Sequence, residues 1–231
     1  MIVIITGASK GIGFELMKQF AGSEYLVLAV SRQVKSVTAY VSKNNVVNVL
    51  PVQADISKHT GIDKIYRTCK KLNKPVSVLI NNAGLLINKS FEKITEKELT
   101  AVYQTNVFAP FLLIQKLQPL MGGKASSHIV NISSMGGFQG SAKFPGLSAY
   151  SSSKTALSGL TECLAEEFKN RNISVNCLAI GAVQTEMLSK AFPGYKAPLK
   201  PAQMAGYIYD FALKGHEFYN GKILPVSSTT P

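Results

Sequence analysis

The chain has 231 residues, of which 46% are hydrophobic and 16% are charged. This balance excludes a disordered chain, because enough apolar surface is present to bury a core. The length fits one large domain or two small ones, and because the chain has no repeats or low-complexity linkers we predict one domain spanning residues 1–231. The net charge of +12 does not predict a nucleic-acid partner, because the lysines are scattered and only Arg32, Arg67 and Arg171 are arginines.

Short apolar, β-branched runs alternate with stretches of helix length along the whole chain. Strands buried on both faces have such continuous apolar sequences, and we predict them at residues 2–5, 25–30, 46–52, 76–80, 128–132, 173–179 and 222–226. Helices are predicted at residues 11–22, 33–43, 57–73, 95–121 with an interruption, 150–170 and 201–214. The alternation predicts an α/β fold: a single-domain, Rossmann-type, doubly wound parallel sheet of about seven strands with helices on both faces.

Capping residues support two of these helices. Thr95, followed three residues later by Glu98, forms a capping-box pattern at the start of the interrupted helix. Ser57 or Thr60 is expected to cap the helix at 57–73.

Two stretches, 135–149 and 188–200, are predicted to be irregular because they are rich in Gly, Ser or Pro. Both follow strands at their carboxyl ends, where open α/β sheets bind ligands, so we predict a substrate loop at each, the second one short. Their apolar side chains either line the pocket of an apolar substrate or pack the loops down; they are Met135, Phe138, Phe144, Leu147, Met187, Leu188 and Phe192.

The first predicted strand runs into a glycine-rich turn, TGASKGIG, at residues 6–13. Its glycines permit a tight turn and let backbone amides approach a pyrophosphate at the start of the following helix. The spacing is GxxxGxG rather than the GxGxxG of the standard fingerprint, and a purely structural turn is the alternative. We predict dinucleotide binding through Gly7, Ser9, Lys10, Gly11, Ile12 and Gly13.

The end of the second predicted strand bears on the choice of dinucleotide. An Asp or Glu is expected there to bind the ribose hydroxyls of NAD(H), but the chain has Ser31 and Arg32. These two residues, with Lys10, can bind a 2′-phosphate by charge-assisted contacts, although Arg32 also fits a solvated loop. We therefore predict NADP(H) as the preferred cofactor, with NAD(H) as the alternative.

A possible acid–base pair lies at the start of the helix predicted at 150–170. Tyr150 and Lys154 are four residues apart and so share one helix face, where the ammonium is expected to lower the pKa of the phenol. Ser134, at the end of the preceding strand, can hydrogen-bond a substrate oxygen. Asn106 interrupts the helix predicted at 95–121, and its side chain alone would also fit a satisfied buried amide.

These motifs together resemble the short-chain dehydrogenase/reductase family. TGASKGIG at 6–13, NNAG at 81–84, the Asn106 segment, ISS at 132–134 and YSSSK at 150–154 occur in the order and spacing of that family, over roughly residues 1–190. By this resemblance Tyr150 is the catalytic acid/base, Ser134 polarises the substrate carbonyl, and Lys154 binds the nicotinamide ribose. Asn106 is implied to hold a water that links Lys154 to a proton relay.

The resemblance also implies cofactor contacts outside the glycine-rich turn. They come from Asp55 and Ile56 near the adenine, from Asn82, Ala83 and Gly84 along the cofactor, and from Gly181, Val183 and Thr185 at the carboxamide. Ile180 stands where the family usually has a proline, which leaves this turn less rigid. Asp55 fits a cap or turn role before Ser57 equally well.

The expected activity is NADPH-dependent reduction of a ketone or aldehyde to an alcohol, or the reverse, with the proton handled by Tyr150. The alternative within this class is a reductase of 3-oxoacyl thioesters on acyl-carrier protein or coenzyme A, anionic carriers that the +12 charge would attract. A cofactor-binding regulator without catalysis is disfavoured, because it would not need the acid–base pair. A homodimer or homotetramer is expected by the resemblance, although the C-terminus ends in SSTTP where the family often has Asp-Gly-Gly.

Cysteines and histidines exclude several other classes. Cys69, Cys163 and Cys177 are widely spaced and odd in number, which predicts no disulfide framework and favours a reducing, cytoplasmic compartment. No metal site is expected, because the histidines are scattered. No apolar run has the roughly 18 residues of a membrane helix, and no membrane partner is expected.

Overall fold

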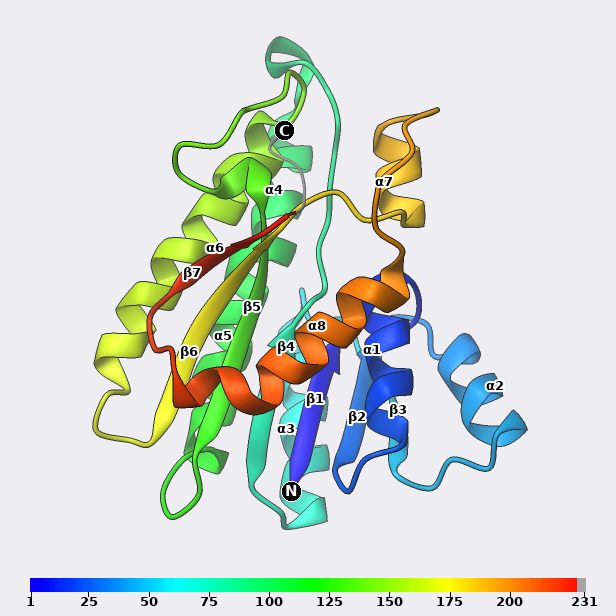
Figure 1. Cartoon of the computed structure of the whole chain (residues 1–231), viewed down its shortest axis with the longest axis vertical. Helices are drawn as coiled ribbons and strands as arrows, with labels where there is room; N and C mark the ends of the chain where they lie inside the picture. Colours follow the sequence, from blue (N-terminus) through cyan, green and yellow to red (C-terminus); the bar gives the residue numbers. More distant parts are fainter. Residues whose placement is uncertain (228–231) are drawn as a thin grey trace.

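The computed structural model describes residues 1–227, and within them seven parallel strands form one sheet in the order β3-β2-β1-β4-β5-β6-β7 (Figure 1). The strands are β1 (Ile2–Thr6), β2 (Leu26–Ser31), β3 (Val49–Gln53), β4 (Val76–Asn81), β5 (Ser127–Ser134), β6 (Ile173–Ile180) and β7 (Ile223–Val226). The predicted fold class is confirmed.

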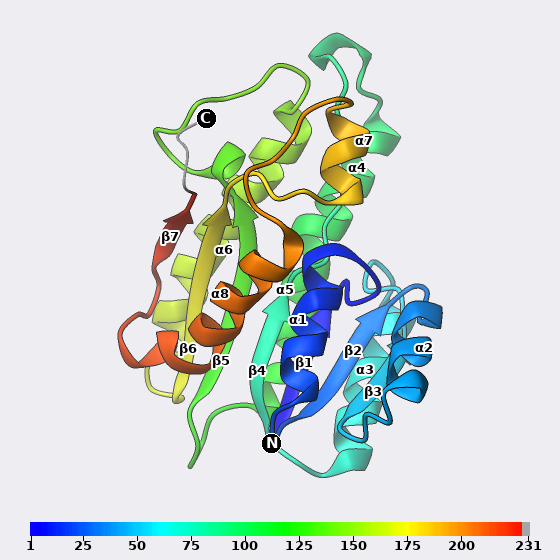
Figure 2. The same ribbon diagram turned by 45° about the vertical axis from the view of Figure 1, so that its right-hand side comes forward.

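Each face of the sheet is covered by helices because alternate strand residues point to opposite sides. Ile2 and Ile4 belong to the core shared with α3 (His59–Leu72), α5 (Ala109–Leu117) and α6 (Ser148–Glu167). Val3 and Ile5 belong to the core shared with α1 (Gly11–Ala21), α2 (Lys35–Lys43) and α8 (Pro201–Lys214). Figure 2 shows these two layers on either side of the twisted sheet.

Several predicted boundaries are wrong by a few residues. β3 begins at Val49, three residues later than expected, because Asn45 has φ +51° and Val47 is 95% exposed before the strand starts. The stretch 188–200 is not wholly irregular, since α7 (Glu186–Ala191) overlaps its first residues.

The predicted cap of α3 is also wrong. Lys58 precedes the helix and makes no side-chain cap, while Thr60 lies inside the first turn. The Ser57 hydroxyl instead donates to Asp55 Oδ1 at 2.7 Å, and the Ser57 N–H donates to the same oxygen. Residues 55–57 therefore form an Asx-type turn, which keeps the hydroxyl away from the start of α3.

The predicted interruption at Asn106 is a π-helix. It spans Gln104–Phe108, between α4 (Glu96–Tyr103) and α5, and closes with Ala109 N–H donating to the carbonyl of Gln104. The wider turn places the Asn106 side chain, which is fully buried, toward the carboxyl edge of the sheet.

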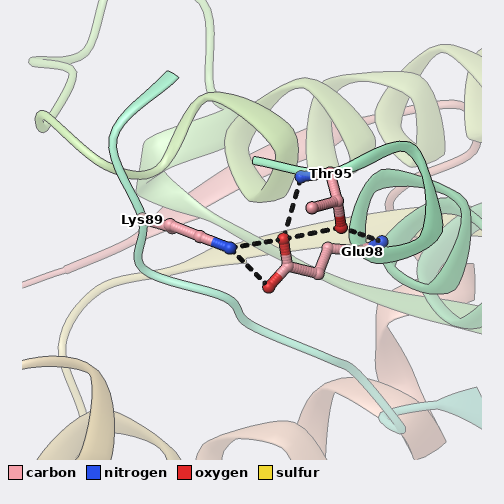
Figure 3. A network of polar contacts seen from close by, with 3 residues as sticks. All are labelled: Lys89, Thr95 and Glu98. Atoms are coloured by element: carbon pink, nitrogen blue, oxygen red, sulfur yellow. Dashed lines mark hydrogen bonds and ion pairs between the residues drawn. The ribbon is translucent and has the colours of Figure 1, made fainter. Parts of the chain in front are cut away.

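The capping box at the start of α4 forms as predicted, and Lys89 extends it (Figure 3). Glu98 N–H donates to Thr95 Oγ1, and Glu98 Oε2 accepts from the Thr95 N–H and hydroxyl, both at 2.9 Å. The Lys89 ammonium contacts both carboxylate oxygens, at 2.8 and 3.0 Å. Hydrogen bonds from Lys89 and Thr95 hold the pKa of Glu98 at about 2, so the network is charged throughout the neutral range.

Within residues 1–227, no helix is long and apolar enough to cross a membrane. The C-terminal departure from the family pattern, at residues 227–231, falls mostly outside the described part of the chain, which ends at Ser227.

Replacing Thr95 with Ala removes the N-cap acceptor of α4. We expect the free energy of unfolding to fall by about 1 kcal/mol, which lowers the melting temperature by roughly 2–4 °C for a domain of this size. Thermal denaturation of Thr95→Ala beside Thr95→Ser, which keeps the hydroxyl, measures this. Equal melting temperatures for Thr95→Ala and the unsubstituted protein would show that the cap contributes nothing.

Candidate active site

A cleft of about 1610 Å³ opens along the carboxyl ends of the strands. It lies where the strand order reverses between β1 and β4, because the chain goes from β1 outward to β3 and then returns to β4 on the other side of β1. Open α/β sheets bind their ligands at such a switch point. All predicted site residues line this cleft except Asn106, which is buried beneath it.

Thr6, at the end of β1, joins the two turns that form the floor of the cleft. Its hydroxyl oxygen accepts hydrogen bonds from the N–H groups of Asn82 and Ala83, each at 3.1 Å, and donates to the Ile80 carbonyl at 3.3 Å. The Asn82 side chain returns a hydrogen bond to the Thr6 carbonyl at 2.8 Å. The glycine-rich turn and the NNAG turn are therefore held together as one unit.

The glycine-rich turn requires glycine at several positions for different reasons. Gly7 has φ +71° and Gly11 has φ +57°, in the left-handed region that favours glycine. A Cβ at Gly13 would lie 2.4 Å from the Asn82 amide nitrogen and from the Gly7 carbonyl oxygen. No acidic residue occupies the first turn of α1 and no side chain caps it, so no carboxylate of this helix competes with an anion for its first N–H groups.

Cations gather at the end of the cleft beyond β2. Arg32 and Lys35 both line it and are exposed, and Lys35 begins α2. Ser31 is buried, and its hydroxyl already donates to the Gln33 carbonyl at 2.6 Å. Its oxygen therefore remains an acceptor, while donors for an anion come from Arg32 and Lys35.

Asp55 also lines this end of the cleft. Partial burial acts to raise its pKa, but hydrogen bonds from Ser57 and the charges of Arg32 and Lys58 hold the pKa below its usual value. The carboxylate is thus both a turn residue, as one hypothesis had it, and part of the cleft wall.

Lys10, the cation of the glycine-rich turn, has a protein partner. Its ammonium lies 2.9 Å from Glu186 Oε2 at the start of α7. Thr185, the preceding residue, caps α7 by accepting from the Leu188 N–H, and its methyl carbon would lie 3.4 Å from a Cβ at Gly11. The start of α7 therefore rests against the glycine-rich turn.

The predicted catalytic side chains meet at the opposite end of the cleft, where α6 starts beside the end of β5. The Tyr150 phenol is hydrogen-bonded to Ser134, and the Lys154 ammonium lies 5.8 Å from the centre of the Tyr150 ring. Lys154 is only 4% exposed and donates to the Ile132 carbonyl at 2.8 Å. A substrate oxygen placed between Ser134 and Tyr150 would reach two hydroxyls.

The predicted lowering of the Tyr150 pKa is wrong for this structure. Burial raises the pKa of the phenol, and the Ser134 hydrogen bond opposes it without reversing the direction. Burial lowers the pKa of Lys154 to about 8, and nearby Cys177 acts in the opposite sense. At neutral pH the arrangement therefore holds a protonated phenol next to an ammonium.

Asn106 supports this region through its amide group. Its Oδ1 accepts from the Leu85 N–H at 2.8 Å, and its Nδ2 donates to the Leu85 carbonyl and to Ser153 Oγ, both at 2.9 Å. The amide thereby fixes the chain that follows the NNAG turn against α6. The role implied by the resemblance, a water held for a proton relay, stays a prediction.

The segment after β6 borders the centre of the cleft. Gly181 N–H donates to the Val226 carbonyl at 2.9 Å, and a Cβ at Gly181 would lie 2.4 Å from Ser227 Oγ. Val183 is buried and forms an isolated bridge with Leu199. Ile180 extends the pairing of β6 with β7, so this position is held by the sheet.

Six of the seven predicted apolar pocket residues line the cleft, and Phe138 does not. Sequence reasoning missed Thr6, Lys35, Leu86 and Tyr195. The position of Lys35 just after Arg32 could have marked it, whereas nothing local distinguishes Tyr195, which is 49% exposed at the cleft mouth.

The residues present fit a nicotinamide dinucleotide. The cleft is continuous from Arg32, across the glycine-rich turn, to Lys154. The buried Lys154 ammonium uses one of its three donors on the Ile132 carbonyl, which leaves two for ribose hydroxyls.

Comparison with known proteins matches the short chain dehydrogenase model over residues 1–196. The chain is 28% identical to dehydrogenase/reductase SDR family member 4 of Mus musculus, covering 100% of this chain and 87% of that protein. It is 27% identical to the 3-oxoacyl-(acyl-carrier-protein) reductase FabG of Chlamydia trachomatis, covering 96% and 94%. The 3-ketoacyl-(acyl-carrier-protein) reductase of Brucella melitensis, solved in complex with NADH, superposes with a TM-score of 0.86 at 26% identity, covering 99% and 97%.

Replacing Lys154 with Met is expected to stabilise the fold. Because the pKa of Lys154 is lowered, its charge destabilises the folded state at all pH values below about 8. This destabilisation fades as the pH rises toward 10.5, the pKa of Lys154 in the unfolded chain. We expect a gain of about 1–3 kcal/mol in unfolding free energy at pH 7, shrinking above pH 8.

Chemical denaturation at pH 7 and pH 9.5 measures this gain. Lys169→Met, which removes an exposed lysine paired with Glu166, is the control and should give no such pH dependence. A Lys154→Met protein less stable than the unsubstituted one at pH 7 would contradict the expectation.

Proposed function

Because the chain belongs to the short-chain dehydrogenase/reductase family of oxidoreductases, we propose that it is an NADP(H)-dependent reductase of ketones or aldehydes. The observation that carries the proposal is the meeting of Ser134, Tyr150 and Lys154 at the inner end of a cleft long enough for a dinucleotide. When bound, the reduced nicotinamide supplies a hydride to the carbonyl carbon.

The chain's own residues handle the proton and the developing charge. Tyr150 is protonated at neutral pH and donates its proton to the carbonyl oxygen, while the Ser134 hydroxyl hydrogen-bonds the same oxygen. The Lys154 ammonium, fixed by the Ile132 carbonyl, lies close enough to stabilise the phenolate that remains. Asn106 positions this group through Leu85 and Ser153.

The preference for NADP(H) over NAD(H) rests on the charges at the outer end of the cleft. Arg32 and Lys35 are exposed cations there, and Ser31 stands where an acidic residue would repel a 2′-phosphate. NAD(H) is the alternative, and the solved Brucella melitensis relative carries NADH.

The substrate end of the cleft favours an apolar molecule. The cleft lining includes the apolar side chains Leu86, Met135, Phe144, Leu147, Leu188 and Phe192. A 3-oxoacyl thioester on an anionic carrier is a second candidate, supported by similarity to two proteins named as 3-oxoacyl or 3-ketoacyl reductases. Its acyl chain suits the same apolar lining.

We further propose that the protein assembles as a homodimer or homotetramer.

Tyr150→Phe tests the chemistry. With each of an apolar ketone, an aldehyde and a 3-oxoacyl thioester, NADPH oxidation is followed spectroscopically for the unsubstituted protein and the variant. We expect turnover with at least one of them, and a loss of roughly 10²–10⁴ in rate on removing the hydroxyl, with NADPH affinity retained. Near-full activity of Tyr150→Phe would refute the assignment of the acid, and turnover of the thioester alone would select the second candidate.

Arg32→Ala tests the cofactor preference. Losing a charge-assisted hydrogen bond to the 2′-phosphate should lower kcat/KM with NADPH by roughly tenfold to a hundredfold and leave the value with NADH nearly unchanged. Arg67→Ala, at an exposed position of α3, is the matched control. An unsubstituted protein that uses NADH at least as efficiently as NADPH would show the proposed preference to be wrong.

A further inference from the structure

An ion pair connects two segments of the cleft that are 176 residues apart in sequence. Lys10 belongs to the glycine-rich turn, and Glu186 is the first residue of α7, which lies above the start of α1 (Figure 2). Both residues line the cleft. The pair therefore sits on the path of the cofactor rather than on a remote surface.

Glu186 has a second cation to bind. Its Oε1 lies 2.5 Å from the Lys190 ammonium one turn further along α7, while Oε2 contacts Lys10. Hydrogen bonds from Lys190 and Lys10 hold the pKa of Glu186 at about 2, so its charge is permanent at neutral pH. If Lys10 moves away, the carboxylate keeps Lys190 and is not left unpaired.

The Lys10 ammonium carries a single compact charge, so a carboxylate and a phosphate, which repel each other, compete for it. All three side chains are at least half exposed, between 50% and 74%, and such surface ion pairs are weak. A phosphate near −2 charge is a stronger partner for an ammonium than a screened carboxylate. Lys10 can therefore leave Glu186 for a 2′-phosphate, but losing the Lys10–Glu186 contact weakens the binding of that phosphate. A dinucleotide without the 2′-phosphate does not incur this loss.

We propose that Glu186 is a specificity-determining residue that competes with the 2′-phosphate of NADP(H) for Lys10. Glu186 thereby moderates the preference for NADP(H) that Arg32 and Lys35 confer. The inference rests on the proposed function, since it presupposes that the cleft binds a nicotinamide dinucleotide.

A double-mutant cycle tests the competition. Dissociation constants for NADPH and NADH are measured by fluorescence titration for the full-length unsubstituted chain, Glu186→Gln, Lys10→Gln and the double variant. Low ionic strength, about 50 mM, is used because salt screens exposed pairs. The ratio of the NADPH to the NADH dissociation constant is the readout, so that general effects on dinucleotide binding cancel.

We expect Glu186→Gln to lower this ratio about two- to fivefold, the range that loss of an exposed ion pair implies. In the Lys10→Gln background, the same substitution should change the ratio by less than half as much. Glu166→Gln, which removes a carboxylate paired with Lys169 away from the cleft, is the control and should leave the ratio unchanged.

Two results would overturn the inference while leaving the proposed function intact. One is an unchanged ratio in Glu186→Gln when both dinucleotides bind. The other is an equal change in both Lys10 backgrounds, which would mean that Glu186 acts on the phosphate by direct repulsion rather than through Lys10. Failure of the unsubstituted chain to bind either dinucleotide would instead refute the proposed function, and this inference with it.

Discussion

The architecture of the site depends on the close approach of two turns at the centre of the sheet. The Thr6 hydroxyl binds two successive N–H groups of the NNAG turn, and Asn82 binds back to the end of β1. This approach leaves no room for a side chain at Gly13. It also sets the direction in which α1 leaves the sheet, and thus where a phosphate would meet its first N–H groups. β1 and β4 are neighbours because the strand order reverses between them. The reversal and the Thr6 hydroxyl bonds together therefore define the cleft.

A second constraint is the burial of Lys154 and its consequence for proton chemistry. The ammonium lies among sheet and helix atoms, fixed by the Ile132 carbonyl, and its pKa falls to about 8. The same burial raises the pKa of Tyr150, so the phenol stays protonated in the protein itself. Reduction of a carbonyl needs a proton donor, and this environment supplies one. The fold therefore carries an unfavourable buried charge where the proposed chemistry benefits from it.

Periodicity and spacing predicted most of the fold, since parallel strands covered on both faces leave long apolar runs and the motifs follow strand ends. They could not predict α7, which has only six residues and is fixed by the Thr185 cap and by contact with Lys10, a partner far away in sequence. The pKa of Tyr150 was predicted in the wrong direction, because spacing along a helix reveals a neighbouring charge but not the loss of solvent. Lys35 escaped notice for a similar reason: only the folded cleft shows that the start of α2 faces the same space as Arg32.

The π-helix at Gln104–Phe108 has a consequence for how this protein can change in length. A π-turn accommodates one residue more than an α-turn within the same rotation, so deleting a residue within it would restore a regular helix and leave the residues after it on the same faces. Leu113, Ile114 and Leu117 would keep their place in the core, and Phe111 would stay about half exposed. The loss would fall on the buried Asn106 amide, whose contacts with Leu85 and Ser153 depend on the wider turn, so the extra residue serves the site rather than the core.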